Sequence, residues 1–113
     1  MRVVALVSDL MDRSRIAAAV PAATFAADIA SITDAVTDAT TTGTAVVVID
    51  LARHGDAVAA VRKGSPDAFI VAFGSHVDDE QLLAARAAGA DRVLPRSRFF
   101  RDPAAAVART GRP

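Results

Sequence analysis

Three hydrophobic runs in this chain end near charged residues that could together form an acidic site. The run Val46–Ile49 is followed by Asp50, an earlier run by Ser8 and Asp9, and a later one leads through a proline to Arg96. The carboxyl ends of parallel strands meet at one edge of a sheet, where open α/β folds place their sites. Two carboxylates and a cation at this edge suit either Mg²⁺-assisted chemistry on a carboxylate or an ion-pair cluster.

Three interpretations of this cluster stay open. In the favoured one, Asp9, Asp50 and Arg96 form a static ion-pair cluster, and we expect Arg96 to face Asp50 or Asp9 across the sheet edge. In the second, these residues form a working acidic site, in which Asp9 and Asp50 could supply two carboxylate ligands to a divalent ion. In the third, the sheet edge binds an unrelated small ligand.

Other polar residues follow strands at the same edge. His54 and His76 could join Asp50 in a transition-metal site, although single histidines in loops are more often solvent-exposed polar residues. Gly74 and Ser75 lie at a strand-to-helix turn that could bind phosphate through backbone amides, but no glycine-rich fingerprint accompanies them. We expect no hydrolase chemistry and no enzymatic activity, because no serine has a plausible His-acid partnership in a G-x-S-x-G setting; the serines considered are Ser8, Ser14 and Ser75.

The composition indicates one folded domain. The chain has 113 residues, of which 52% are apolar, and its formal net charge is +0. We expect a single domain over residues 1–113 with a frayed tail at 110–113. The charges are spread along the chain, which disfavours nucleic acid and membrane surfaces as partners. Cysteine is absent, so disulfides and thiolate metal sites are excluded. No apolar run approaches the ~20 residues of a membrane span, and no signal-peptide layout is visible, so we expect a cytoplasmic protein.

Hydrophobic patterns predict five strands in alternation with about five helices. Strands that are apolar on both faces require helices on both sides of a parallel sheet. The expected fold class is therefore α/β, a three-layer α/β/α sandwich with a doubly wound sheet. The predicted strands are Val3–Val7, Ala23–Ala26, Ala45–Ile49, Ala68–Phe73 and Arg92–Leu94.

Capping residues predict where the helices begin and end. Asp12 is expected to cap a helix over Arg13–Val20, and Thr40–Gly43 is expected to be a loop. Ser31 with Asp34 is expected to be a capping pair for the next helix. Asp56 is expected to begin a helix that Gly64 ends, and Ser75 or Asp78 a helix that Gly89 ends. Asp102 with Pro103 is expected to begin the last helix.

The layout resembles a response-regulator receiver domain over nearly the whole chain. The most specific segments are Val46–Leu51, which matches the third strand with its phosphoacceptor, and Ala87–Leu94, which is similar to the family's AGAD-x-x-L run. The resemblance implies a flavodoxin-like fold with strand order 2-1-3-4-5. It also implies that Asp50 occupies the phosphoacceptor position and Asp9 one of the two acid positions that hold Mg²⁺.

The match to the receiver pattern is partial. Ser8 stands where the family has its second acid, and Arg96 stands where it has a lysine. Gly74 stands where the family has its switch hydroxyl, and Ser75 follows one residue later. A guanidinium does not replace a compact ammonium in a tight site. The loop after Asp50 is also shortened. Mg²⁺ is therefore a possible rather than a certain cofactor, with Asp9 and Asp50 as its ligands.

The favoured function is a stand-alone, degenerate receiver-like signalling module that is not switched by ordinary aspartyl phosphorylation. The alternatives are a working receiver phosphorylated on Asp50 by a histidine kinase in a phosphorelay, and a small-ligand-binding flavodoxin-like protein. The partner would be a signalling protein or a second copy of the chain. The resemblance implies a contact face formed by the fourth helix, the fifth strand and the fifth helix, with Leu82, Leu83, Arg86, Phe99 and Phe100 as candidate residues.

Overall fold

A computed structural model describes residues 2–108 and shows one five-stranded parallel sheet. The strand order is β2-β1-β3-β4-β5, which confirms the predicted receiver-like, flavodoxin-like topology. Each strand lies within two residues of its predicted position. The strands are β1 (Arg2–Leu6), β2 (Thr24–Phe25), β3 (Ala45–Asp50), β4 (Phe69–Gly74) and β5 (Arg92–Pro95).

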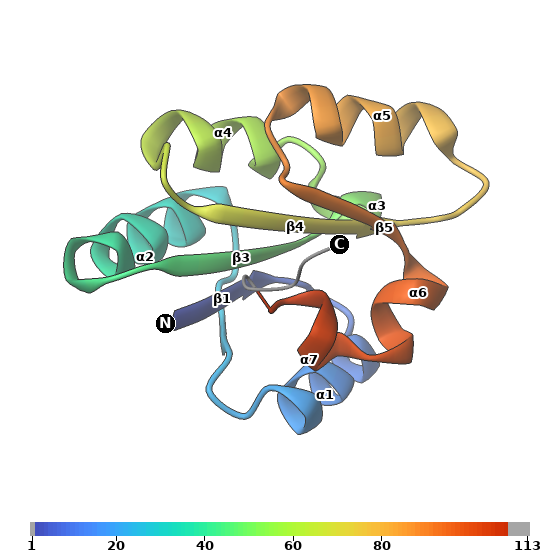
Figure 1. The fold of residues 1–113 in the computed structure, drawn as a ribbon, viewed down its shortest axis with the longest axis horizontal. Coiled ribbons are helices and arrows are strands. Elements are labelled where there is room, and N and C mark those ends of the chain that lie inside the picture. The colour runs from blue at the N-terminus through green and yellow to red at the C-terminus, as the bar shows by residue number, and fades with distance from the viewer. Residues whose placement is uncertain (1, 109–113) are drawn as a thin grey trace.

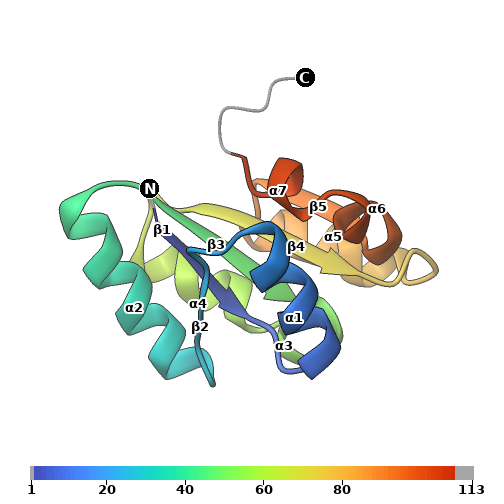
Figure 2. The ribbon, with the colours of Figure 1, turned by 90° about the horizontal axis from the view of Figure 1, so that it is seen from below.

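Helices cover both faces of this sheet, as the apolar strands require. Figure 1 shows α4 and α5 above the strands and α1, α6 and α7 below them, and Figure 2 shows α1 across the lower face. The helices are α1 (Leu10–Ala19), α2 (Ile29–Thr42), α3 (Leu51–His54), α4 (Ala57–Gly64), α5 (Asp79–Ala88), α6 (Arg96–Arg101) and α7 (Pro103–Ala106).

The central strand β3 divides the hydrophobic core into two halves. Every residue of β3 is buried, and alternate side chains point to opposite faces. Val47 and Ile49 join the cluster under α2, α4 and α5, whereas Val46 and Val48 join the cluster under α1, α6 and α7. This burial on both faces explains why β3 is a continuous β-branched run that can deliver Asp50 to the sheet edge at a fixed position.

Two helices begin earlier than predicted, because a different aspartate caps each of them. Asp9, not Asp12, caps α1 and accepts a hydrogen bond from the Asp12 backbone N–H at 3.0 Å. Asp28 caps α2 in a capping box with Ser31, so the predicted pairing of Ser31 with Asp34 is wrong. An N-cap carboxylate accepts from the N–H two or three residues later, which both observed aspartates do.

The threonines at the end of α2 are helical, and the predicted loop at Thr40–Gly43 is wrong except at Gly43. The hydroxyls of Thr40, Thr41 and Thr42 donate to backbone carbonyls three residues earlier. These hydroxyls therefore have partners on the helix itself and do not need a loop conformation.

The predictions for the later helices are confirmed, but two short helices were missed. Asp78 caps α5 through the Gln81 N–H, Gly89 ends it with φ 117°, and Asp102 caps α7. Asp56 occupies the N-cap position of α4 without a side-chain hydrogen bond. The additional helices are α3, directly after Asp50, and α6. The predicted frayed tail at 110–113 lies outside the described residues.

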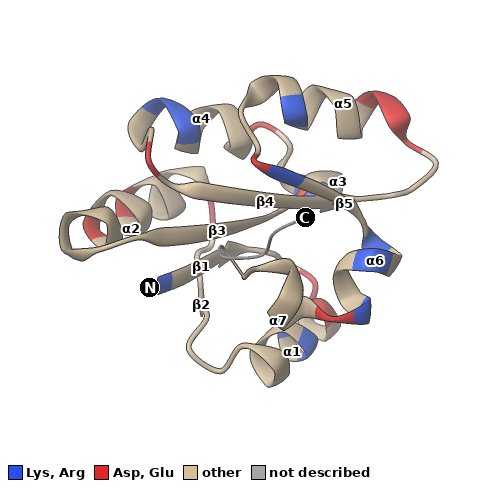
Figure 3. Ribbon diagram, viewed as in Figure 1, with Lys and Arg blue, Asp and Glu red and all other residues tan. Residues whose placement is uncertain are grey.

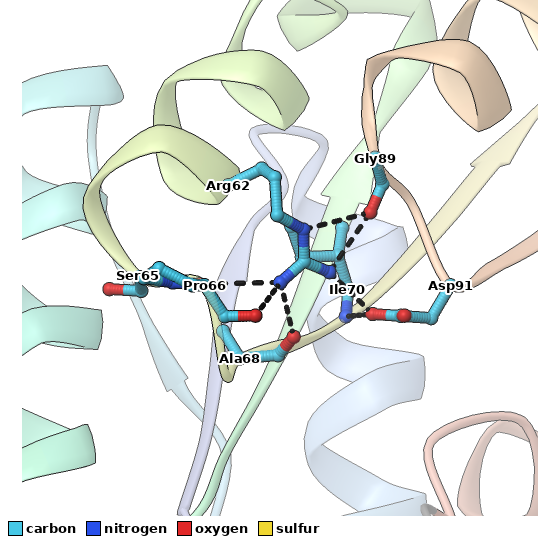
Figure 4. Close-up of polar contacts among 7 residues, drawn as sticks. All are labelled: Arg62, Ser65, Pro66, Ala68, Ile70, Gly89 and Asp91. Carbon is cyan, nitrogen blue, oxygen red and sulfur yellow. Dashed lines mark hydrogen bonds and ion pairs between the residues drawn. The ribbon is translucent and has the colours of Figure 1, made fainter.

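Arg62 joins three segments at the sheet edge opposite Asp50. Its guanidinium donates to the carbonyl oxygens of Gly89, Ser65, Pro66 and Ala68, and it forms an ion pair with Asp91 at 2.6 Å (Figure 4). The Asp91 carboxylate also accepts a hydrogen bond from the backbone N–H of Ile70 in β4, at 2.8 Å. The run that resembles the receiver motif therefore closes α5 and connects it to α4 and β4.

Candidate functional site at the carboxyl edge of the sheet

Asp50 lies at the carboxyl edge, where the sequence predicted it. It ends β3 beside Phe73 of β4 and is only 3% exposed. Its carboxylate caps α3 by accepting from the Ala52 N–H at 3.1 Å. Burial raises the pKa of the Asp50 carboxyl, because a poorly solvated site disfavours the charged form, although the Ala52 N–H and the charge of Arg96 oppose this shift.

Arg96 pairs with Asp12, not with Asp50 or Asp9, and this corrects the predicted ion pair. Its two terminal nitrogens donate to the two carboxylate oxygens of Asp12 at 2.9 and 2.8 Å. Asp12 is 5% exposed on the first turn of α1. Hydrogen bonding to Asp12 raises the pKa of the Arg96 guanidinium, and the charges of Asp50 and Asp9 contribute only at longer range. The bidentate geometry suits a planar guanidinium, and an ammonium group could not reproduce it.

The Arg96 guanidinium also lies over aromatic rings, which fixes its position further. Its central carbon is 5.0 Å from the centroid of Phe100 and 5.6 Å from that of Phe73. A cation over an aromatic face gains electrostatic attraction, most strongly where water is excluded. The Arg96 guanidinium is therefore oriented both by its ion pair with Asp12 and by the rings of Phe73 and Phe100.

Ser8 has a partner that sequence reasoning missed. Its hydroxyl lies 2.8 Å from Nε2 of His54, at an exposed position. His54 ends α3, so the shortened loop after Asp50 folds into a helix that carries the imidazole to the position beside Ser8. The Ser8–His54 contact is not a His-acid partnership, because no acidic side chain hydrogen-bonds to His54 among the described residues.

Gln81 occupies the space in front of Gly74. A Cβ atom at Gly74 would lie 3.1 Å from the Gln81 amide oxygen and 3.4 Å from the side chain of Leu51. The Gln81 side chain donates to the Leu51 carbonyl oxygen at 2.9 Å and so connects α5 to the segment after Asp50. Ser75, one residue later, uses its hydroxyl to accept from the Val77 N–H. Packing thus fills the place where a receiver would have its switch hydroxyl.

The two predicted magnesium ligands both serve as helix caps. Asp9 caps α1 and Asp50 caps α3, so each carboxylate already accepts a backbone hydrogen bond. Over residues 2–108, no group of three or more histidine and acidic side chains is placed to hold a metal ion. A site for Mg²⁺ here would rest on two carboxylates and water, which is within the usual range for this ion.

Phe99 and Phe100 belong to the core, so their proposed role as interface anchors is wrong. They are 0% and 8% exposed and pack with Phe73, at centroid distances of 4.7 and 5.1 Å. Of the remaining candidates, Leu83 and Arg86 are exposed, whereas Leu82 is half-buried against the core. Leu83 is 66% exposed, and together with Leu82 and Arg86 it lines a cavity of about 390 Å³ between α5 and β5.

We predict that Asp50→Asn stabilises the protein at neutral pH by about 1 kcal/mol or less. The pKa of Asp50 is higher in the folded state, so the folded protein binds the proton more tightly, and the ionised carboxylate opposes folding above that pKa. The advantage of asparagine should therefore shrink as the pH falls through the raised pKa toward the ordinary value of 3.8. Urea denaturation of both proteins over a pH series measures this difference.

Asp56→Asn is the matched control, because Asp56 is exposed and its side chain makes no capping bond. Its effect should stay small at every pH. An Asp50→Asn protein that is less stable at neutral pH, with a gap that closes in acid, would show instead that the carboxylate stabilises the fold.

Solved structures of receiver-like proteins resemble this fold. A CheY-like protein, TadZ, from Pseudomonas aeruginosa is 23% identical with a TM-score of 0.68, over 86% of this chain and 87% of that chain. A putative pilus assembly-related protein from Burkholderia pseudomallei is 18% identical with a TM-score of 0.68, over 98% and 94%. A LuxR family DNA-binding response regulator from Silicibacter pomeroyi is 19% identical with a TM-score of 0.65, over 95% and 92%.

These likenesses confirm the predicted receiver-like architecture. No family model matches the chain, and no curated protein matches it. In the part of the chain that the structure describes, none of the helices combines the length and apolar character needed to cross a membrane.

Proposed function

We propose that this chain is a receiver-like protein-interaction module in which Asp50 is not switched by ordinary aspartyl phosphorylation. The observation that carries the proposal is the bidentate pair between Arg96 and Asp12, 2.8 and 2.9 Å long. Arg96, which stands at the receiver's lysine position, is therefore paired with Asp12 on α1 and not with Asp50, the expected phosphoacceptor.

Switching by aspartyl phosphorylation needs three parts around the nucleophile, and each is altered here. A divalent ion must bridge the carboxylate to the phosphoryl oxygens, but Ser8, bonded to His54, replaces one acid. A cation must neutralise the developing charge, but Arg96 is held by Asp12. A hydroxyl must read out the phosphoryl group, but position 74 is glycine and Gln81 fills its surroundings.

The surface between α5 and β5 is the proposed contact face for a protein partner. The apolar side chains of Leu82, Leu83, Val93 and Pro95 line its cavity, and Asp79 and Arg86 supply one charge of each sign at the rim. Leu83 is 66% exposed, Leu82 and Pro95 are half-buried, and apolar side chains beside polar ones are the usual anatomy of a protein interface. One structural neighbour is described as related to pilus assembly and another as a DNA-binding response regulator, so the shared fold does not select one output.

Intact-mass analysis after incubation with Mg²⁺ and a small phosphodonor tests the proposal. A receiver known to accept phosphate, in the same reaction, serves as the positive control, and Asp50→Asn as the negative one. The expected result is no phosphate increment on this chain while the control receiver is labelled. A labile increment on the wild-type chain that disappears in Asp50→Asn would overturn the proposal.

A further inference from the structure

A cavity lined by three arginines lies beside the Asp50 site, between α1, α6 and the turn after β4. It has a volume of about 550 Å³, and Arg15, Arg96 and Arg101 line it. Figure 3 shows basic positions on α1 and α6, the two helices that supply these arginines. No acidic side chain lines the cavity. Asp12 pairs with Arg96, whereas Arg15 and Arg101 have no ion-pair partner among the described residues, so the cavity presents about two uncompensated positive charges.

Two of the guanidinium groups are held in place by the core. Arg15 lies 4.4 Å from the ring centroid of Phe100, and Arg96 lies 5.0 Å from the same centroid. Phe100 is 8% exposed and is itself held by Phe73 and Phe99. Side chains that are already ordered lose little entropy when a ligand binds, so this arrangement favours binding.

Unused hydrogen-bond donors remain around this cavity. Arg15 makes one long bond, 3.5 Å, to the Phe100 carbonyl oxygen, which leaves most of its donors free. Arg101 makes no hydrogen bond or ion pair with any residue that the structure describes. Ser97 adds a hydroxyl, and the Ser75 hydroxyl, which accepts from the Val77 N–H, can still donate its proton. Converging guanidinium and hydroxyl donors are the groups that recognise phosphate.

We propose that this cavity binds a small-molecule phosphate monoester. A phosphate monoester carries about −1.5 to −2 charges at neutral pH, which matches the uncompensated charge of the cavity. The volume falls within the range of about 300–1,000 Å³ that small-molecule sites occupy, so the phosphate and its organic group both fit. This binding is independent of the protein-contact face between α5 and β5 and of any phosphorylation of Asp50.

Titration with AMP, inorganic phosphate and adenosine, followed by amide NMR shifts, tests this site. AMP should shift the amides of Ser75, His76 and Ser97 with a Kd of about 1 mM or tighter at low salt. Inorganic phosphate should shift the same amides at higher concentration, and adenosine should leave them unchanged. Arg101→Gln and Arg15→Gln should each weaken AMP binding about fivefold or more, whereas Arg53→Gln, an exposed arginine on α3, should not change it.

The Arg101→Gln protein is the decisive variant, because Arg101 is exposed and its loss leaves no described contact broken. Amide spectra of each free variant verify that the fold is intact. The proposal is overturned if about 10 mM AMP shifts none of these amides. It is equally overturned if adenosine shifts them as much as AMP does, or if both arginine variants bind AMP as the wild type does.

Discussion

Replacing Phe99 with alanine should lower the free energy of unfolding by about 3–5 kcal/mol. Phe99 is completely buried, stacks on Phe73 at a centroid distance of 4.7 Å and meets Phe100 edge to face at 4.9 Å. The substitution removes both ring contacts, each worth about 0.5–1.5 kcal/mol beyond burial, and leaves a cavity in the half of the core under α6. Urea denaturation measures the loss.

Two further variants make the Phe99 result interpretable. Phe99→Leu keeps the position apolar and should cost less, about 1–2 kcal/mol, so a measurable transition remains even if the alanine protein unfolds. Leu83→Ala, at a position that is 66% exposed, should change stability by less than about 1 kcal/mol. Equal effects of Phe99→Ala and Leu83→Ala would mean that Phe99 is a surface residue, as the interface hypothesis supposed.

Arg62→Ala should destabilise the protein by about 2–4 kcal/mol, a large effect for a single arginine on a helix. The substitution removes the guanidinium donor of the Pro66, Ala68 and Gly89 carbonyls, and it removes the ion-pair partner of Asp91. Arg62→Lys should recover only part of this loss, because one ammonium cannot reach several carbonyls in a fork geometry. Thermal and urea unfolding both report the difference.

Two comparisons separate the Arg62 network from a general effect of lost charge. Arg53→Ala removes an exposed arginine on α3 and should cost less than about 0.5 kcal/mol. Gly89→Ala should be destabilising through the same network, because φ is 117° and the new Cβ would lie 2.7 Å from Cγ of Arg62. A stable Arg62→Ala protein would show that water replaces the guanidinium at these carbonyls without loss.

The centre of the sheet was predictable from the sequence because β1, β3 and β4 are largely buried on both faces. The run that forms β3 has no polar residue before Asp50, so neither a helix nor a half-exposed strand fits it. Gly89 was also predictable, because a helix that ends in a left-handed residue favours glycine. These features depend on a single residue or a short run, which the sequence displays directly.

The polar contacts at the sheet edge were not predictable, because several partners compete for each group. Asp9 and Asp12 are three residues apart, and either could cap α1; the one that does not is free to bind Arg96. The three-residue spacing of Asp9 and Asp12 could have indicated that Asp9 is the N-cap, since an N-cap carboxylate accepts from the N–H three residues later. Gln81 gave no such indication, because its contact with Leu51 depends on how α5 packs.

The aromatic pair was misplaced for a related reason. Phe99 and Phe100 lie in a segment with an arginine on either side, which suggested an exposed anchor, but six residues form α6 and turn both rings inward. Arg15 and Arg96 then lie over the Phe100 ring. A stretch this short lacks the helical period that would have revealed its buried face.

The most direct test of the central claim is an amide NMR titration with Mg²⁺ and beryllofluoride, a phosphoryl mimic. The bidentate pair of Arg96 with Asp12 predicts that Asp50 and Gly74 keep their shifts at saturating mimic. New resonances for Asp50 that spread to Gly74 and to the face between α5 and β5 would contradict the account. That outcome would identify this chain as a working switch.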